Sequence, residues 1–161
     1  MQQDARDDLK VISQAEGALL SELPGYAYDS RGGRGITVYV IDTGINPNHP
    51  VSVPDYELPM WLTPFQEFRN TLGSIRWLFI SGEPQIRRDD HGHGTCVASK
   101  VASLSFGVAK SADIVVVKIR LVDNNIPISN IIAAWGAVGA DIASNNLEQK
   151  AVISASMSGE L

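Results

Sequence analysis

An aspartate and a histidine in glycine-rich surroundings are the residues of this sequence best suited to acid–base chemistry. His93 lies between two glycines, just before a run of small residues, and Asp42 follows an apolar run and precedes Thr43. A catalytic histidine removes the proton of a serine or cysteine nucleophile, and a carboxylate behind it fixes its tautomer and stabilises the imidazolium. Bare backbone beside the imidazole lets a substrate and a neighbouring strand approach closely. The two residues therefore predict an acid–base pair, provided that the fold brings them together.

The elements around these residues are expected to alternate between strands and helices. Short apolar runs without polar alternation predict strands buried on both faces of a parallel sheet, and apolar residues at helical spacing predict the helices. Functional groups of such α/β sheets gather at the carboxyl ends of the strands. A strand end facing a helix start would bring Asp42 and His93 together there. The predicted strands are 36–41, 76–80, 114–119 and 151–153, and the main predicted helices are 95–104 and 129–142.

Local signals predict where other segments begin and end. Helical spacing extends over residues 9–23 and is broken at Pro24-Gly25. Ser129 suits the N-cap of the helix that follows it. The proline-rich stretch 46–64 is expected to be a loop. The fourth strand is expected to form an open apolar edge, which predicts weak stability or aggregation unless a partner covers it.

Several apolar side chains are expected in the core. Trp61, Trp77 and Trp135 are interpreted as core aromatics, and Cys96 as a small core residue, with a thiol near the histidine as the alternative. The face of the helix 129–142 that packs on the sheet is expected to be Ile131, Ile132, Trp135, Val138 and Ile142.

Composition excludes several classes of protein. With 161 residues, 44% hydrophobic and 19% charged, the chain is long enough for one core. No apolar run reaches the roughly 20 residues that a membrane-spanning helix requires, and the first ten residues are polar, unlike a secretory signal. A net charge of -5 argues against a nucleic-acid surface. The single cysteine excludes an internal disulfide.

Two motifs resemble those of the subtilisin-like serine peptidases, and most of all their fungal, proteinase K-type members. The segment 40–45, Val-Ile-Asp-Thr-Gly-Ile, is similar to the aspartate motif, and 92–98, Gly-His-Gly-Thr-Cys-Val-Ala, is similar to the histidine motif. The likeness extends from about residue 26 to residue 159, with 107–112 and 151–157 also similar to family segments.

The resemblance implies a fold, an activity and a setting. The fold would be an α/β three-layer sandwich with a parallel sheet, of which this chain is the first half, divided into an amino-terminal segment 1–34 and a sheet-forming core 35–161. The activity would be that of a serine endopeptidase acting on extended peptide or protein substrates, with His93 as base and Asp42 orienting it. The setting would be secreted or vacuolar.

The sequence departs from the family pattern at the nucleophile. The family motif Gly-Thr-Ser-Met-Ala-x-Pro and the oxyanion asparagine do not occur among these residues. Ser156-Met157 matches two letters of that motif, but it follows Ala155 and continues a strand. By resemblance, Ser156, Met157 and Ser158 would instead line the pocket for a substrate side chain, and Ser158, where the family usually has glycine, would narrow it. The chain alone is therefore expected to be inactive and to lack a carboxyl-terminal half.

Three interpretations of function stay open. The sequence is either a shortened version of an active peptidase, or a non-catalytic peptide-binding pseudoenzyme, or an enzyme that acts through Ser156. Reading the transcript beyond Leu161 would test the first of these.

A metal site near the histidine motif is the remaining alternative. His91 and His93, with Asp89 and Asp90 nearby, suggest metal ligands, but a third strong ligand at compatible spacing is missing. His91 is better explained as a solvated residue at the rim of a cleft. Calcium sites are common in the family, yet no ligand set can be matched here. No cofactor is therefore expected.

Overall fold

A computed structural model describes residues 1–49, 68, 73–80, 84–122 and 125–157. The predictions for Trp61, for Ser158 and for residues 50–64 of the expected loop lie outside these ranges. The elements, in chain order, are α1 (Asp7–Ile12), the 3-10 turn η1 (Leu20–Glu22), β1 (Thr37–Asp42), β2 (Ile75–Leu78), α2 (His93–Ala102), β3 (Asp113–Lys118), α3 (Ile128–Ser144) and β4 (Ala151–Ala155).

The four strands form one parallel sheet in the order β2-β3-β1-β4. The central strand β1 is buried along its whole length, and Asp42 at its end lies beside Lys118 of β3. Such burial explains why the strand has no polar alternation. The parallel α/β fold predicted from the sequence is confirmed, and β4 forms one edge of the sheet, as expected.

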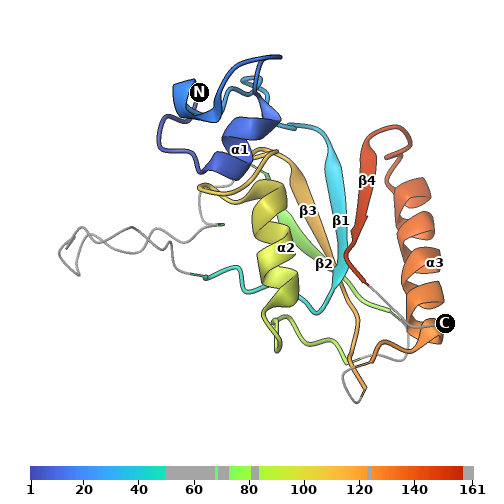
Figure 1. The fold of residues 1–161 in the computed structure, drawn as a ribbon. Coiled ribbons are helices and arrows are strands. Elements are labelled where there is room, and N and C mark those ends of the chain that lie inside the picture. The colour runs from blue at the N-terminus through green and yellow to red at the C-terminus, as the bar shows by residue number, and fades with distance from the viewer. Residues whose placement is uncertain (50–67, 69–72, 81–83, 123–124, 158–161) are drawn as a thin grey trace, which may run out of the picture.

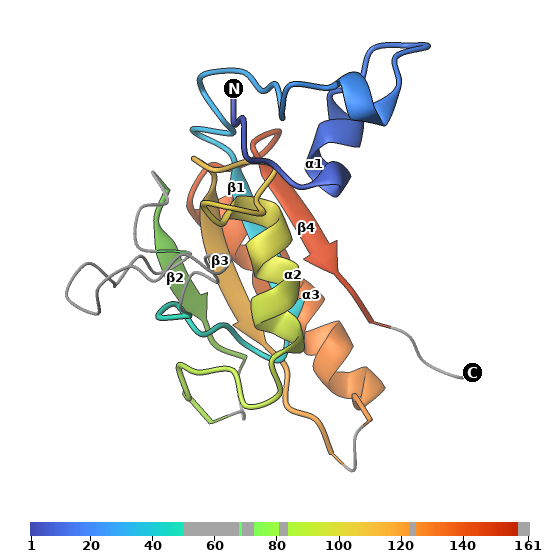
Figure 2. The same ribbon diagram turned by 60° about the vertical axis from the view of Figure 1, so that its left-hand side comes forward.

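The helices cover opposite faces of the sheet, which makes three layers (Figure 1). Alternate side chains of a strand point to opposite faces. Accordingly, Val38 and Val40 of β1 pack in the core that holds Ala98 of α2. Tyr39 and Ile41 pack in the core that holds Val138 of α3. The second view separates the two helices, with α2 in front of the sheet and α3 behind it (Figure 2).

The predicted packing face of α3 was partly wrong. Ile131, Val138 and Ile142 do pack in the core between α3 and the sheet. By contrast, Ile132 and Trp135 are 67% and 48% exposed. The fully buried Ala134 takes the inward position instead. Because α3 is apolar around most of its circumference, spacing alone could not select the side with small residues that lets the helix approach the sheet.

The ends of two helices also differ from prediction. Helix α3 has Pro127 as its N-cap residue, so Ser129 lies inside the helix rather than capping it. The amino-terminal helix is α1, which ends at Ile12 instead of extending to residue 23. The chain turns at Gly17, whose φ of 78° belongs to the left-handed region that glycine tolerates.

The amino-terminal segment packs on the same side of the sheet as α2 (Figure 1). Its own small core consists of Ala5, Leu9 and Tyr26. The Tyr26 hydroxyl donates to the carbonyl of Val108 over 3.0 Å, which ties the segment to the loop after α2. Among the described residues, no helix is both long and apolar enough to cross a bilayer.

Candidate active site

The structure brings Asp42 and His93 into contact at the carboxyl edge of the sheet. Asp42 is the last residue of β1, and His93 is the first residue of α2. The imidazole Nδ1 lies 2.8 Å from Asp42 Oδ1 and 3.0 Å from Oδ2. Because a carboxylate can only accept, Nδ1 carries the proton and the neutral ring keeps Nε2 as an acceptor. This arrangement leaves Nε2 able to take a proton from a nucleophile.

The two side chains differ sharply in exposure. The Asp42 side chain is 2% exposed, whereas the His93 side chain is 47% exposed. The backbone N–H of Thr43 also donates to Asp42 Oδ1 over 2.7 Å, so the buried carboxylate is held from two directions. A fixed anion behind a solvent-accessible imidazole suits a base that must meet an external reactant.

The contact requires α2 to begin almost against the turn after β1. A Cβ atom built on Gly94 would lie 2.2 Å from the Gly44 carbonyl oxygen and 3.0 Å from Asp42 Oδ1. Real side-chain atoms do not approach backbone so closely, so only glycine fits here. The expectation that bare backbone beside His93 admits a neighbouring segment is therefore met at Gly94.

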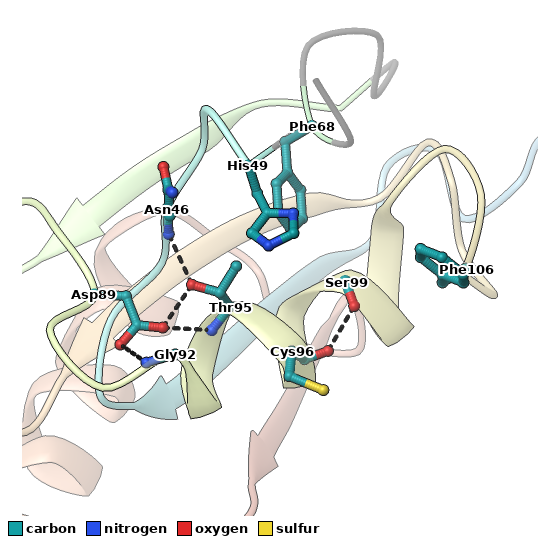
Figure 3. A pocket seen from close by; sticks show the side chains of 9 residues that line it. All are labelled: Asn46, His49, Phe68, Asp89, Gly92, Thr95, Cys96, Ser99 and Phe106. Atoms are coloured by element: carbon teal, nitrogen blue, oxygen red, sulfur yellow. Dashed lines mark hydrogen bonds between the residues drawn. The ribbon is translucent and has the colours of Figure 1, made fainter. Parts of the chain in front are cut away.

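Asp89 lies near the site, and its structural role could not be predicted from the sequence. Its carboxylate accepts hydrogen bonds from the backbone N–H and hydroxyl of Thr95, over 2.8 and 2.5 Å, at the start of α2. It also accepts from the backbone of His91 and Gly92 and from the Thr43 hydroxyl, and Figure 3 shows its bonds to Thr95 and Gly92. An acidic residue just before a helix is a capping signal that a sequence can show. The hydrogen bond between Asp89 and Thr43, in the turn after Asp42, depends on the fold.

The hydrogen bonds to Asp89 control its ionisation. Burial raises the pKa of Asp89, but the hydrogen bonds from Thr95, Gly92 and His91 together outweigh burial and hold this pKa well below its ordinary value. Asp89 is therefore a carboxylate at neutral pH.

The described residues contain no cluster of ligands that would support the alternative of a metal site. There, no three His, Cys, Asp or Glu side chains gather as a metal ion would require. The ring centroids of His91 and His93 are 6.3 Å apart, and the ring planes meet at 70°. Asp90 instead pairs with Lys118 over 2.6 Å and with Arg88. His91 is exposed, consistent with a rim position.

Cys96 is exposed on α2, so its interpretation as a core residue was wrong. It lines a cavity of about 310 Å³ between α2 and the segment after β1 that carries Asn46 and His49 (Figure 3). Thr95 and Ser99 of α2 share that wall, and Phe106 lies at one end. The core positions of the helix belong to Ala98 and Ala102, which face the sheet.

Ser156 and Met157 follow β4 directly. Because Ala155 pairs with Ile41 of β1, Ser156 comes after β4 at the same end of the sheet as Asp42. Ser156 is exposed, whereas Met157 packs partly buried against the core under α3.

Comparison with known proteins identifies close relatives among fungal proteases. The chain is 33% identical to the alkaline serine protease ver112 of Corniculantispora psalliotae, over 99% of this chain and 38% of that protein. It is 34% identical to subtilisin-like protease 4 of Trichophyton equinum, over 83% of this chain and 29% of that protein. The chain thus spans about a third of the length of these curated relatives.

Structural and family comparisons agree with these relatives. The fold is similar to a cold-adapted subtilisin-like serine proteinase, with a TM-score of 0.63 and 26% identity, over 86% of this chain and 42% of that chain. The model of the subtilase family (peptidase S8) matches residues 33–159. The resemblance predicted from the aspartate and histidine motifs is confirmed. This chain belongs to the subtilase family.

Proposed function

We propose that this chain supplies the acid–base pair of a subtilisin-type serine endopeptidase. The observation that carries the proposal is the 2.8 Å contact between His93 Nδ1 and the buried Asp42 carboxylate. Membership of the subtilase family supports the reaction class. In this role, His93 is the base and then the acid, and Asp42 orients the ring and stabilises its protonated form.

The proton transfers follow from this geometry. As a serine oxygen attacks the carbonyl carbon of a peptide bond, His93 Nε2 takes the hydroxyl proton and the carbonyl electrons move onto oxygen. When the intermediate collapses, the C–N bond breaks and the leaving amine takes the proton from Nε2. Water then attacks the acyl-enzyme by the same route, and the serine is released.

The nucleophile of the proposed enzyme lies outside these 161 residues. None of their serines stands in the family's nucleophile motif. We infer that Ser156, Met157 and Ser158 contribute to the pocket for a substrate side chain, and the exposure of Ser156 at the carboxyl end of β4 supports this. The proposed domain consists of the segment 1–34, the core 35–161 and a carboxyl-terminal half that brings the serine and the oxyanion donors.

The proposed substrates are extended peptides and proteins. The names of the relatives, an alkaline serine protease and subtilisin-like proteases, support this class. A secreted or vacuolar location would fit such an enzyme.

A chimera tests the proposal directly. The chain, including residues 156–158, is joined to the corresponding carboxyl-terminal part of the Corniculantispora psalliotae protease, and casein hydrolysis and fluorophosphonate labelling are measured. We expect the chimera to hydrolyse casein and to label. Asp42→Asn should lower kcat by about 10⁴-fold, and His93→Ala by about 10⁶-fold, as expected for the orienting carboxylate and the base of a triad.

Two controls separate the competing interpretations. The 161-residue chain alone should not label, and labelling that Ser156→Ala abolishes would make Ser156 the nucleophile and overturn the proposal. A chimera that unfolds cooperatively and binds peptide without hydrolysing it would also contradict the proposal and support a peptide-binding pseudoenzyme.

A further inference from the structure

At the carboxyl edge of the sheet, a second set of hydrogen bonds joins β1 to α2 beside the contact between Asp42 and His93. We call this set the linkage. Thr43, the residue after Asp42, accepts a hydrogen bond at Oγ1 from the backbone N–H of Gly94, the residue after His93, over 3.0 Å. The same hydroxyl donates its proton to Asp89 Oδ1 over 2.8 Å. The end of β1 and the start of α2 are therefore joined beside the catalytic pair as well as through it.

Asp89 completes this linkage on the helix side. Its Oδ2 accepts both the backbone N–H and the hydroxyl of Thr95, in the first turn of α2. Its Oδ1 accepts the N–H groups of His91 and Gly92, over 3.0 and 2.9 Å, and so shapes the loop that enters the helix. One carboxylate thus fixes the approach to His93, the first turn after it and the turn after Asp42.

We propose that Asp89 is a positioning residue that sets the distance and orientation of His93 relative to Asp42. This inference rests on the function proposed above. Asp89 makes no hydrogen bond to the Asp42 or His93 side chains, so it acts through Thr43 and the first turn of α2 and touches no reacting atom.

The donor count explains why a carboxylate is needed. Five donors converge on the two oxygens of Asp89, and a carboxylate offers acceptor sites on both. An asparagine side chain would present one oxygen and one NH₂ group, whose hydrogens would face either Thr95 or the Thr43 side of the loop. One half of the linkage would then be broken and its donors left unpaired.

The neighbouring Asp90 offers a matched control. It has the same side chain one position later, but it pairs with Lys118 and Arg88 and makes none of the hydrogen bonds to Thr43 or Thr95. Replacing it removes the same charge from the same loop without touching the linkage.

The test measures the proton between His93 and Asp42 by NMR in the 161-residue chain. The exchange rate of the His93 Hδ1 proton with water is compared in the parent, Asp89→Asn and Asp90→Asn. We expect exchange at least tenfold faster in Asp89→Asn and unchanged in Asp90→Asn, with both variants unfolding cooperatively. An unchanged rate in a folded Asp89→Asn, or equal acceleration in both variants, would overturn the inference.

A second pair of variants covers a failure of Asp89→Asn to fold. Thr43→Val removes the bridging hydroxyl with little change of shape, and Thr43→Ser keeps it. Faster exchange in the valine variant, with rescue by serine, supports the linkage, and equal rates in both contradict it.

Kinetics of the active chimera separate this inference from the proposed function. There, Asp89→Asn should lower kcat by up to about 10²-fold, the cost of misplacing a catalytic group by about 1 Å, with KM within about twofold. An inactive parent chimera would refute the proposed function and leave the NMR result intact. Unchanged kcat in Asp89→Asn would refute the positioning role alone.

Discussion

Tyr39 places a hydroxyl inside the core between the sheet and α3. The ring is fully buried, and the hydroxyl donates to Asp141 of α3 over 2.5 Å. Arg76 of β2 donates to the same carboxylate, with 3.0 Å between Arg76 Nη1 and Asp141 Oδ1. The hydrogen bond from Arg76 holds the pKa of Asp141 below its ordinary value, so the carboxylate stays charged. These three side chains connect two strands to one helix through a polar group in an apolar layer.

Because of the buried Tyr39 hydroxyl, we expect the folded chain to lose stability in alkali. Burial, followed by the hydrogen bond to Asp141, raises the pKa of Tyr39 from its ordinary 10.0 to about 12. Since the folded-state pKa is the higher one, the stabilisation is fully present below pH 10 and is lost as the pH rises toward 12. Urea unfolding at a series of pH values should show this decline. Tyr39→Phe should make this decline shallower and cost about 1.5–3 kcal/mol at neutral pH, because the lost hydrogen bond is to a charged group. The same decline in Tyr39→Phe as in the parent would contradict the assignment, and the more exposed Tyr28→Phe serves as control.

We expect the thiol of Cys96 to react with thiol reagents while the chain is folded. Because the residue is exposed on α2, a thiol reagent such as Ellman's reagent should modify one cysteine per folded chain, without prior unfolding. Cys96→Ser should change the free energy of unfolding by no more than about 0.5 kcal/mol, as is usual at surface positions. A thiol that reacts only after denaturant is added would show that the residue is buried.

Single residues could be predicted where their chemistry is local. Asp42 and His93 stand out because their side chains and glycine-rich neighbours suit one reaction. Asp89 could not be assigned in the same way, since its partner Thr43 is 46 residues away in sequence and only the fold brings the two together. Cys96 was misplaced because a small residue in a helix fits a core and a surface equally well.

At the scale of elements, the approach of α2 to the end of β1 decides whether the pair forms. A methyl group on Gly94 would meet the Gly44 carbonyl at 2.2 Å. Gly94→Ala should therefore push the helix start away from β1, lengthen the contact between His93 and Asp42, and destabilise the chain by about 1–3 kcal/mol. Denaturant unfolding and the His93 Hδ1 resonance measure the two effects.

The matched control is a glycine in the middle of α3. A Cβ atom on Gly136 would meet nothing within 4 Å, so Gly136→Ala should stabilise the chain by up to about 1 kcal/mol through helix propensity. If both alanine variants gained stability, the tight approach at Gly94 would be refuted.

The strands were predictable for a physical reason that the helices lack. Strands β1 and β3 are buried on both faces, so they appear as unbroken apolar runs, and their observed bounds lie within one residue of the predicted ones. The start of α2 was predicted two residues late because no side chain at the N-cap position marks it. The free backbone N–H groups of Gly94 and Thr95 are instead bonded to Thr43 and Asp89, which lie outside that position. The packing face of α3 could not be predicted because residue spacing does not show which side of the helix carries side chains small enough to pack on the sheet.

At the scale of the whole molecule, β4 leaves one edge of the sheet unpaired among the described residues. Strand β4 bonds to β1 on one side, and its second residue, Val152, is 52% exposed. Such an edge can pair with another chain. We therefore expect the isolated chain to self-associate as its concentration rises, measured by sedimentation velocity.

Two lysine substitutions locate the surface responsible. Val152→Lys should reduce association by placing a charge on the edge strand, whereas Ile132→Lys, on the equally apolar outer side of α3, should not. The opposite result would assign association to α3. A parent chain that stays monomeric at all concentrations would contradict the expectation itself.

The parallel topology also has a consequence for synthesis. Thr37 pairs with Asp113 on one side of β1 and with Ala151 on the other, so the central strand has no partner close to it in sequence. Such remote pairings form slowly. While a ribosome is still extending the chain, the emerging β1 is a bare hydrophobic segment without a hydrogen-bonding neighbour. A chaperone that shields it until β3 and β4 have been made would raise the yield of folded protein.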